Sequence, residues 1–411
     1  MKRELRSIFS FIVLLAAMLA CANPLSGTAP ASSANVETIV AATFAALTES
    51  VTESSATPLA TLSTSSLLPH SLYFLNNDAA ALAQVYRLDK DGKTVTQLTF
   101  EPANVDDYDV SPIDGSVVYV TNNQLFTVNA DGSNRSMIVD GGVRDENNPF
   151  ITNVNNPVWS PNGETIAFGY KGLNFYSIVS GQYNNVLENK INALDGGFSI
   201  PEELYWPERY SPDGSKLLIT LGYYEGASAA IYYPNGNALI RLNGGEGSLI
   251  CCDNTKWSAD GSVIHAASAS TGMFNAGLWR VDPVNGNVTT LLLGSFETNP
   301  ADVASTPYLG PDGQLYFFYA SVPNTGDFIS RPSLQLVRSA QDGVTNRTVL
   351  NPKIFSTFNE ALWAPDASFV ITASGQTAEA YYGGVTELYY TDGQKAMVQL
   401  LPFAMNLKWG P

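Results

Sequence analysis

The chain has 411 residues, 45% of them hydrophobic, which is enough to build a large core. Its formal net charge of −17 argues against a nucleic-acid partner, because phosphates need clustered Lys and Arg. With two histidines in the sequence, a His-based metal site or a Ser-His-Asp triad has almost no candidate residues. We therefore expect neither a metal nor a cofactor.

Residues 1–20 are typical of a secretory signal peptide. Basic residues precede an apolar run, residues 8–19, that is too short to span a bilayer. The run ends at Cys21 in a sequence that resembles a bacterial lipoprotein processing site. That resemblance implies lipidation of Cys21 and a place on the extracytoplasmic face of a membrane in the cell envelope. Ordinary signal cleavage near this point is the alternative.

Residues 21–69 are rich in Ala, Ser and Thr and poor in large apolar side chains. Such a composition is typical of a flexible tether, since it offers too little apolar surface to fold alone. The sequence thus predicts a signal peptide at 1–20, a lipid-anchored tether at 21–69 and a folded domain at 70–411.

One motif recurs through the folded domain: a Ser-Pro-Asp-Gly turn followed by an apolar strand. Its clearest copy is "YSPDGSKLLIT", and the Pro or its equivalent lies at positions 112, 161, 212, 259, 311, 365 and 411. Pro presets the turn geometry, and Gly accepts the left-handed conformation that leads into the next strand. Repeats of 46 to 54 residues built from short strands predict the blades of a propeller.

The start of the domain lacks this motif. Three strand-like segments, residues 71–77, 84–89 and 94–100, come before the first turn, and the last residues of the chain, "AMNLKWGP", supply the missing inner strand. We therefore predict an all-β fold, a seven-bladed β-propeller of four-stranded blades. Pairing of the C-terminal strand with the first blade would close the ring and remove exposed sheet edges.

The segments "VWSPNGETIAF", "YSPDGSKLLI" and "LFTVNADGSNR" resemble the blades of TolB-like and WD-repeat-like propellers. The resemblance covers about residues 70–411 and implies the fold, but no particular function. The separate α/β domain that precedes the TolB propeller has no counterpart here, and the seven repeats exceed the six blades common in TolB. A TolB role in envelope assembly is therefore not carried over.

Four residues before each turn Ser, the inner strands would place a mostly polar ring at one end of the central channel. The ring positions hold Asp107, Asn156, Pro207, Asn254, Thr306, Glu360 and Asn406. We predict a ligand site that includes Asp107, Asn156, Asn254, Glu360 and Asn406. A water-filled channel whose polar groups cap strand ends is the alternative.

Aromatic residues and cysteines give further candidates. Five of the six tryptophans stand at repeated positions and read as packing between blades, whereas Trp206 is off register and is a candidate exposed binding residue. His265 is expected to be packed and hydrogen-bonded. Cys251 and Cys252 are adjacent, and in an oxidising compartment they are either two thiols or a vicinal disulfide.

Loops between second and third strands are longer in later repeats, so we expect the recognition face on blades four to seven. The aromatic residues available there are Tyr223, Tyr224, Phe274, Phe328, Tyr381 and Tyr382. The predicted function is a membrane-tethered, non-enzymatic binding or scaffold module for a protein, peptide or glycan. The alternatives are a carbohydrate-active hydrolase or lyase that uses channel carboxylates, and a structural component of envelope assembly.

Overall fold

The computed structural model describes residues 66–411, except 146, 195–196, 244–253, 272–274 and 328. The signal peptide, nearly all of the tether, Cys21, Cys251, Cys252, Phe274 and Phe328 lie outside these described residues. Regular structure within them is β-strand apart from one 3₁₀ turn, Pro149–Ile151. That part of the chain accordingly contains no helix with the length and apolar character that a membrane span requires. The predicted all-β fold is confirmed.

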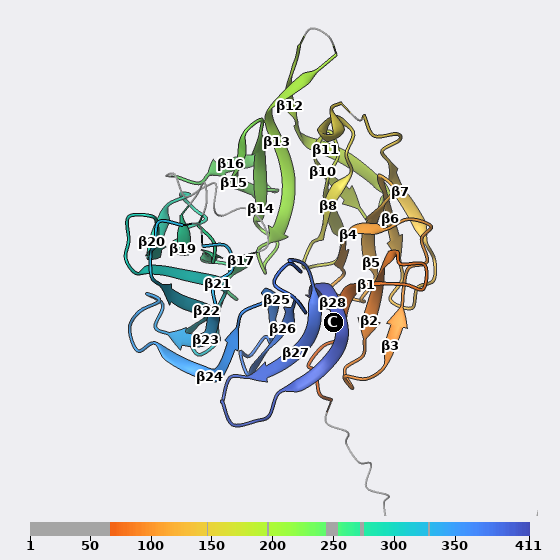
Figure 1. The fold of residues 1–411 in the computed structure, drawn as a ribbon. Coiled ribbons are helices and arrows are strands. Elements are labelled where there is room, and N and C mark those ends of the chain that lie inside the picture. Colours follow the sequence, from red (N-terminus) through yellow and green to blue (C-terminus); the bar gives the residue numbers. More distant parts are fainter. Residues whose placement is uncertain (1–65, 146, 195–196, 244–253, 272–274, 328) are drawn as a thin grey trace, which may run out of the picture. The chain divides into compact units, whose positions relative to one another are not determined.

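Antiparallel sheets follow one another along the chain in the unit that begins at Ser65 (Figure 1). The fourth repeat carries an insertion that begins near Lys190. The strands before this insertion are β1 (Leu72–Asn77), β2 (Ala83–Leu88), β3 (Val95–Gln97), β4 (Val105–Val110), β5 (Val117–Thr121), β6 (Gln124–Val128), β7 (Ser136–Asp140), β8 (Asn155–Trp159), β9 (Thr165–Gly169), β10 (Gly172–Ser177) and β11 (Gln182–Glu188).

The strands of the second half continue the same pattern. They are β12 (Lys190–Ala193), β13 (Ser199–Tyr210), β14 (Leu217–Tyr223), β15 (Gly226–Tyr233), β16 (Ala238–Arg241), β17 (Thr255–Trp257), β18 (Ile264–Ser268), β19 (Ala276–Val281), β20 (Val288–Gly294), β21 (Ala301–Leu309), β22 (Leu315–Val322), β23 (Leu334–Ser339), β24 (Thr348–Phe355), β25 (Phe358–Trp363), β26 (Phe369–Ser374), β27 (Gly384–Tyr390) and β28 (Val398–Trp409). Strands β4–β7, β8–β11, β17–β20 and β21–β24 form sheets of four, as predicted.

The last strand joins the two extremities of the folded domain. Strand β28 pairs with β27 through its first half, where Ala404 faces Gly384, and with β1 through its second half, where Lys408 faces Tyr73. Strands β25–β28 and β1–β3 thereby form one continuous sheet. The predicted closure by the C-terminal strand is confirmed, while the count of seven blades stays a prediction.

Three features of the fold differ from the expectation: the number of strands in one sheet, the length of one loop and the start of the folded domain. The insertion adds β12 as a fifth strand against the start of β13, so this sheet is not four-stranded. In the same sheet β14 and β15 extend into a tight hairpin, with Tyr223 opposite Gly226, so the long loop expected there is absent. Leu68, assigned to the tether, is completely buried in a core cluster, because its apolar side chain completes the packing of the closing sheet.

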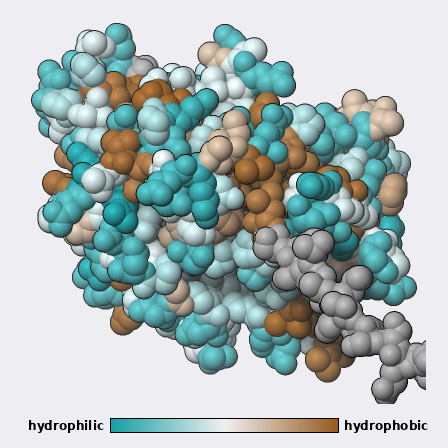
Figure 2. Space-filling view, turned by 90° about the horizontal axis from the view of Figure 1, so that it is seen from below, coloured by the Kyte–Doolittle hydropathy of each residue, from teal (hydrophilic) through white to brown (hydrophobic). Residues whose placement is uncertain are grey.

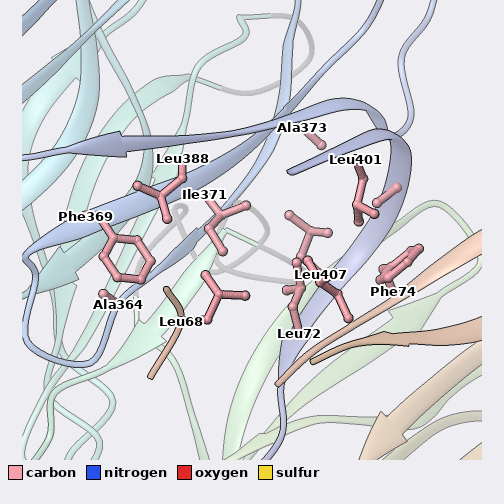
Figure 3. Close-up of a cluster of buried hydrophobic side chains, with 12 residues drawn as sticks. Leu68, Leu72, Phe74, Ala364, Phe369, Ile371, Ala373, Leu388, Leu401 and Leu407 are labelled. Atoms are coloured by element: carbon pink, nitrogen blue, oxygen red, sulfur yellow. The ribbon is translucent and has the colours of Figure 1, made fainter. Parts of the chain in front are cut away.

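Apolar clusters lie between neighbouring sheets. Figure 3 shows the cluster at the closing sheet, in which Leu68, Leu72 and Leu407 pack against Ile371 and Leu388. Burial of one such side chain stabilises a fold by about 1.5–3 kcal/mol. The tryptophans at repeated positions behave as predicted, since Trp159, Trp257, Trp279 and Trp363 are buried and Trp409 packs against a core cluster.

The recurring turn ends each inner strand by local chemistry. In the clearest copy, Asp213 accepts hydrogen bonds from Ser211 Oγ at 2.5 Å and from the Ser215 amide at 3.1 Å. These hydrogen bonds hold the pKa of Asp213 at about 2. Gly214 adopts a φ of +70°, which explains the Gly at this position. Because the turns are equivalent, residues at the same distance before them lie at equivalent points of the inner strands.

Candidate functional site

The predicted ring positions coincide with irregularities of the inner strands. The ladder shifts register between Val105 and Asp107, between Phe358 and Glu360, and at the matching points of four further inner strands. Asn156 and Asn406 have φ values of 49° and 54°, in the left-handed region. Such bulges bend a strand and release backbone groups from the ladder, so polar side chains nearby find local partners.

Glu360 shows what these partners are. Its Oε1 accepts a hydrogen bond from the Asn406 amide at 2.9 Å, and its Oε2 accepts one from the Leu407 amide at 3.1 Å. In the same way Asp107 Oδ1 accepts the Tyr108 amide at 2.8 Å. The Glu360 carboxylate therefore supports the bulge of the closing strand, in keeping with the alternative of polar groups that cap strand ends.

Replacing Glu360 with Gln should destabilise the domain, because an amide offers one acceptor oxygen where the carboxylate offers two. We expect a loss of about 1–2 kcal/mol in the free energy of unfolding. Urea denaturation of the variant would measure it, with the exposed loop residue change Glu379→Gln as the control. An unchanged midpoint in Glu360→Gln would remove the structural role assigned to this side chain.

Trp206 is not the exposed aromatic that its position in the sequence predicts. It is half-buried, and a methyl group placed on Gly222 would lie 2.7 Å from its ring. A methyl group on Gly169 of the neighbouring sheet would lie 3.4 Å from the same ring. The indole thus fills the space that two glycines leave open, and a role in ligand binding stays a prediction.

A cavity of about 160 Å³ opens among the long loops of the last three sheets. It is lined by Asn254, Ser268, Ala269, Ser270, Ser305, Ser330, Arg331, Pro332, Leu334, Ser356, Phe358 and Asn359. Hydroxyl, amide and guanidinium groups dominate this lining, so the cavity offers both donors and acceptors of hydrogen bonds. Of the predicted ring, Asn254 lines it, and the Asn254 Oδ1 accepts a hydrogen bond from Ser305 Oγ at 3.2 Å.

Arg331 fixes the wall of this cavity. Its guanidinium donates to the carbonyls of Ala378 at 2.5 Å and Thr357 at 3.1 Å, and to Asn359 Oδ1. Asn359 in turn donates to the carbonyl of Ala380 at 3.0 Å. Within the described residues no salt bridge neutralises Arg331, so its charge is held in place by neutral groups.

Exposed tyrosines stand beside Arg331. The Arg331 guanidinium lies 4.7 Å from the centre of the Tyr381 ring, and Tyr381 and Tyr382 are 57% and 82% exposed. Tyr224 is also exposed, whereas Tyr223 is half-buried. Tyr and Arg, together with Trp, are enriched among the residues that contribute most of the binding energy in protein interfaces.

Figure 2 shows the distribution of hydrophilic and hydrophobic residues on one face of the molecule, where hydrophilic residues surround separate apolar groups.

Most residues that line this cavity were not among the candidates predicted from the sequence, and the recognition face stays a prediction. Arg331 lies in the connection between β22 and β23, whereas Ser356 and Asn359 lie at the junction of β24 and β25, and no motif in the sequence relates the two segments. The available signal was the length of the loop "SVPNTGDFISRPS", which contains an Arg among small polar residues. Long loops are confirmed in the last three sheets that contribute to the cavity, and blade four contributes a tight hairpin instead.

His265 is packed as expected but not hydrogen-bonded. Its side chain is 1% exposed, and neither ring nitrogen has a partner among the described residues. Burial and the nearby Arg280 lower the pKa of His265 to about 4, so the ring is neutral at pH 7. The described residues contain no group of three or more His, Cys, Asp and Glu side chains that could hold a metal.

Comparisons with known proteins found distant structural likenesses and no relative by sequence. No protein-family model matches the sequence, and a search of curated proteins found no relative. A putative TolB from Agrobacterium tumefaciens is 18% identical over 72% of this chain and 95% of its own, with a TM-score of 0.41. A β-propeller domain of Swd1 from Myceliophteria thermophila is 10% identical over 74% and 87%, with a TM-score of 0.44.

A structure from a study of two prolyl endopeptidases is also similar. It is 12% identical over 83% of this chain and 49% of its own, with a TM-score of 0.50. At such identities the likenesses concern the fold alone. The antiparallel sheets themselves agree with the predicted β-propeller, and the function has to be argued from the site.

Proposed function

We propose that this protein is a non-enzymatic binding module of the bacterial cell envelope, tethered through a lipid on Cys21. Its partner is a protein or peptide segment that places one polar residue in the cavity beside Arg331. The observation that carries the proposal is this cavity itself, with Arg331 held rigid and Tyr381 and Tyr382 exposed at its side.

The size of the cavity favours binding over catalysis. A volume of about 160 Å³ holds roughly one side chain or one sugar ring, whereas pockets that enclose a small-molecule ligand are usually about 300–1,000 Å³. Arg331 lacks a carboxylate partner among the described residues, so it favours a ligand group that accepts hydrogen bonds, such as a peptide carboxylate or amide oxygen. The tyrosines add rigid contact area at low entropic cost.

Capture of a partner from envelope extracts by this protein should depend on Arg331 and Tyr382. We expect Arg331→Ala and Tyr382→Ser each to weaken capture of a partner by at least about tenfold, as the loss of an interface anchor does. Quantitative pull-down with the mature protein measures this, and Tyr183→Ser, which alters an exposed tyrosine on β11, is the matched control. Equal capture by all three variants would contradict the proposal.

A glycan array and a polysaccharide turnover assay distinguish the two alternatives, a glycan-binding module and a carbohydrate-active enzyme. Glycan binding that Arg331→Ala abolishes would keep the site and replace the peptide as its ligand. Turnover of a polysaccharide that Asp107→Asn abolishes would favour the carbohydrate-active enzyme instead, because the cavity at Arg331 would then be irrelevant to the activity.

A further inference from the structure

The inner strands carry a second set of equivalent positions, two residues before each turn. These positions hold Asp109, Val158, Arg209, Lys256, Tyr308, Leu362 and Lys408. Three cations and one carboxylate stand here in a chain whose net charge is −17. Arg209, Lys256 and Lys408 come from three different sheets, and the Arg209 guanidinium reaches the strand of Lys256, where it hydrogen-bonds the adjacent Thr255 carbonyl. The positive charge of Arg209 also acts to lower the pKa of both lysines.

Lys408 is compensated by acidic neighbours. Its Nζ donates to Asp109 Oδ1 at 3.1 Å and to the Tyr108 carbonyl at 2.5 Å. Burial lowers the pKa of Lys408, but Asp109 and Asp107 outweigh it and raise the pKa above the usual value. Lys408 is therefore protonated at neutral pH, and its charge is compensated by the two carboxylates.

Lys256 has the opposite surroundings. Within the described residues it has no salt bridge, and its Nζ lies 6.0 Å from the centre of the Tyr308 ring. Burial and the positive charge of Arg209 lower the pKa of Lys256 to about 8. Directly opposite in the ladder stands His265, which is buried and has two unpartnered ring nitrogens.

Arg209 is held against the strand of Lys256. Its guanidinium donates a hydrogen bond to the Thr255 carbonyl, and its own carbonyl accepts one from Trp257 Nε1 at 3.2 Å. The fold thus keeps two cations close together without a carboxylate between them among the described residues. Like charges in such a place cost free energy, and an anion would offset that cost.

We propose that Arg209 and Lys256 form an anion site at the inner edges of β13 and β17. The site takes an oxyanion, either a carboxylate or a phosphate or sulfate, because guanidinium and ammonium groups together match such oxygens. Neither Arg209 nor Lys256 is among the residues that line the cavity at Arg331.

Selective acylation of lysines in the mature protein tests the site. Lys256 is partly exposed, so acetic anhydride can reach it, and at pH 8 it should react faster than fully exposed lysines because about half of it is neutral. Inorganic phosphate, sulfate or acetate at millimolar concentration should slow this reaction several-fold, while chloride at equal ionic strength should not. Protection by phosphate and sulfate alone assigns a tetrahedral oxyanion, and protection by acetate assigns a carboxylate.

Thermal denaturation gives an independent measurement. The protecting anion should raise the melting temperature of the wild type and of Lys353→Met, which removes an exposed lysine, but not that of Lys256→Met. An equal rise in Lys256→Met, or acylation of Lys256 at the same rate with and without all three anions, would overturn the proposal. The acylation measurement uses the wild type, so it decides even if Lys256→Met does not fold.

Discussion

Deletion of residues 405–411 should prevent the domain from folding into a stable ring. The deletion removes the half of β28 that pairs with β1, together with the buried Leu407 and the packed Trp409. It also removes the hydrogen bond from Tyr108 Oη to the Asn406 carbonyl, at 2.5 Å. Loss of two such side chains alone costs about 5–10 kcal/mol, which is comparable with the whole stability of a typical domain.

The control for this deletion keeps the pairing of β28 with β1 and changes only the order in which the strands are connected. A circular permutant that links residue 411 to residue 66 and opens the exposed loop at residues 325–327 should fold and melt cooperatively. Circular dichroism and differential scanning calorimetry compare the two proteins. A truncated chain that melts like the wild type would show that closure by β28 contributes little.

Protonation of Glu203 should give the second large effect, a loss of stability in acid. Glu203 is almost completely buried; it accepts hydrogen bonds from Arg241, from Lys190 Nζ at 3.0 Å and from Tyr205 Oη at 2.6 Å. Burial raises the pKa of Glu203, but these donors outweigh it and hold the pKa at about 2.

A folded-state pKa below the unfolded value of 4.5 means that the native state favours the ionised carboxylate. The resulting stabilisation, about 3 kcal/mol by linkage, is complete above pH 4.5 and is lost as the pH falls through 2. Glu203→Gln should lose a similar amount at pH 7 because Arg241 keeps its charge without its partner.

Chemical denaturation between pH 2 and pH 7 measures this dependence. The neighbouring Glu202→Gln, at an exposed position that accepts a hydrogen bond from Asn192, is the matched control and should follow the wild-type curve. If Glu203→Gln and the wild type lost stability in parallel over the whole range, the acid sensitivity would have to be assigned to other carboxylates.

The sequence alone predicted those parts of the fold that depend on local chemistry. Pro, Asp and Gly in the turn specify its geometry, so the ends of inner strands and the closing role of "AMNLKWGP" could be read from one chain. Strand β12 was missed because its insertion carries no turn motif. The predicted ring positions coincide with bulges of the inner strands, and the carboxylate of Glu360 accepts hydrogen bonds from the backbone of β28, a contact that only the bulge reveals.

The candidate site was less predictable because it is assembled from distant loops. Arg331, between β22 and β23, donates hydrogen bonds to Asn359 in β25 and to the carbonyl of Ala378 between β26 and β27. These contacts depend on how neighbouring sheets pack. Trp206 was misjudged for a similar reason, since Gly169 and Gly222 make room for its ring from two different sheets.

The seam between the first and the last strand has a consequence for the timing of synthesis. Residues 405–409 are synthesised after every other described strand of the domain, yet β1 cannot acquire its inner neighbour without them. The nascent domain therefore remains an open arc until β28 has been made. For a chain that crosses a membrane to reach the cell envelope, as proposed here, this delay is an advantage, because an open arc is easier to unfold for passage than a closed ring.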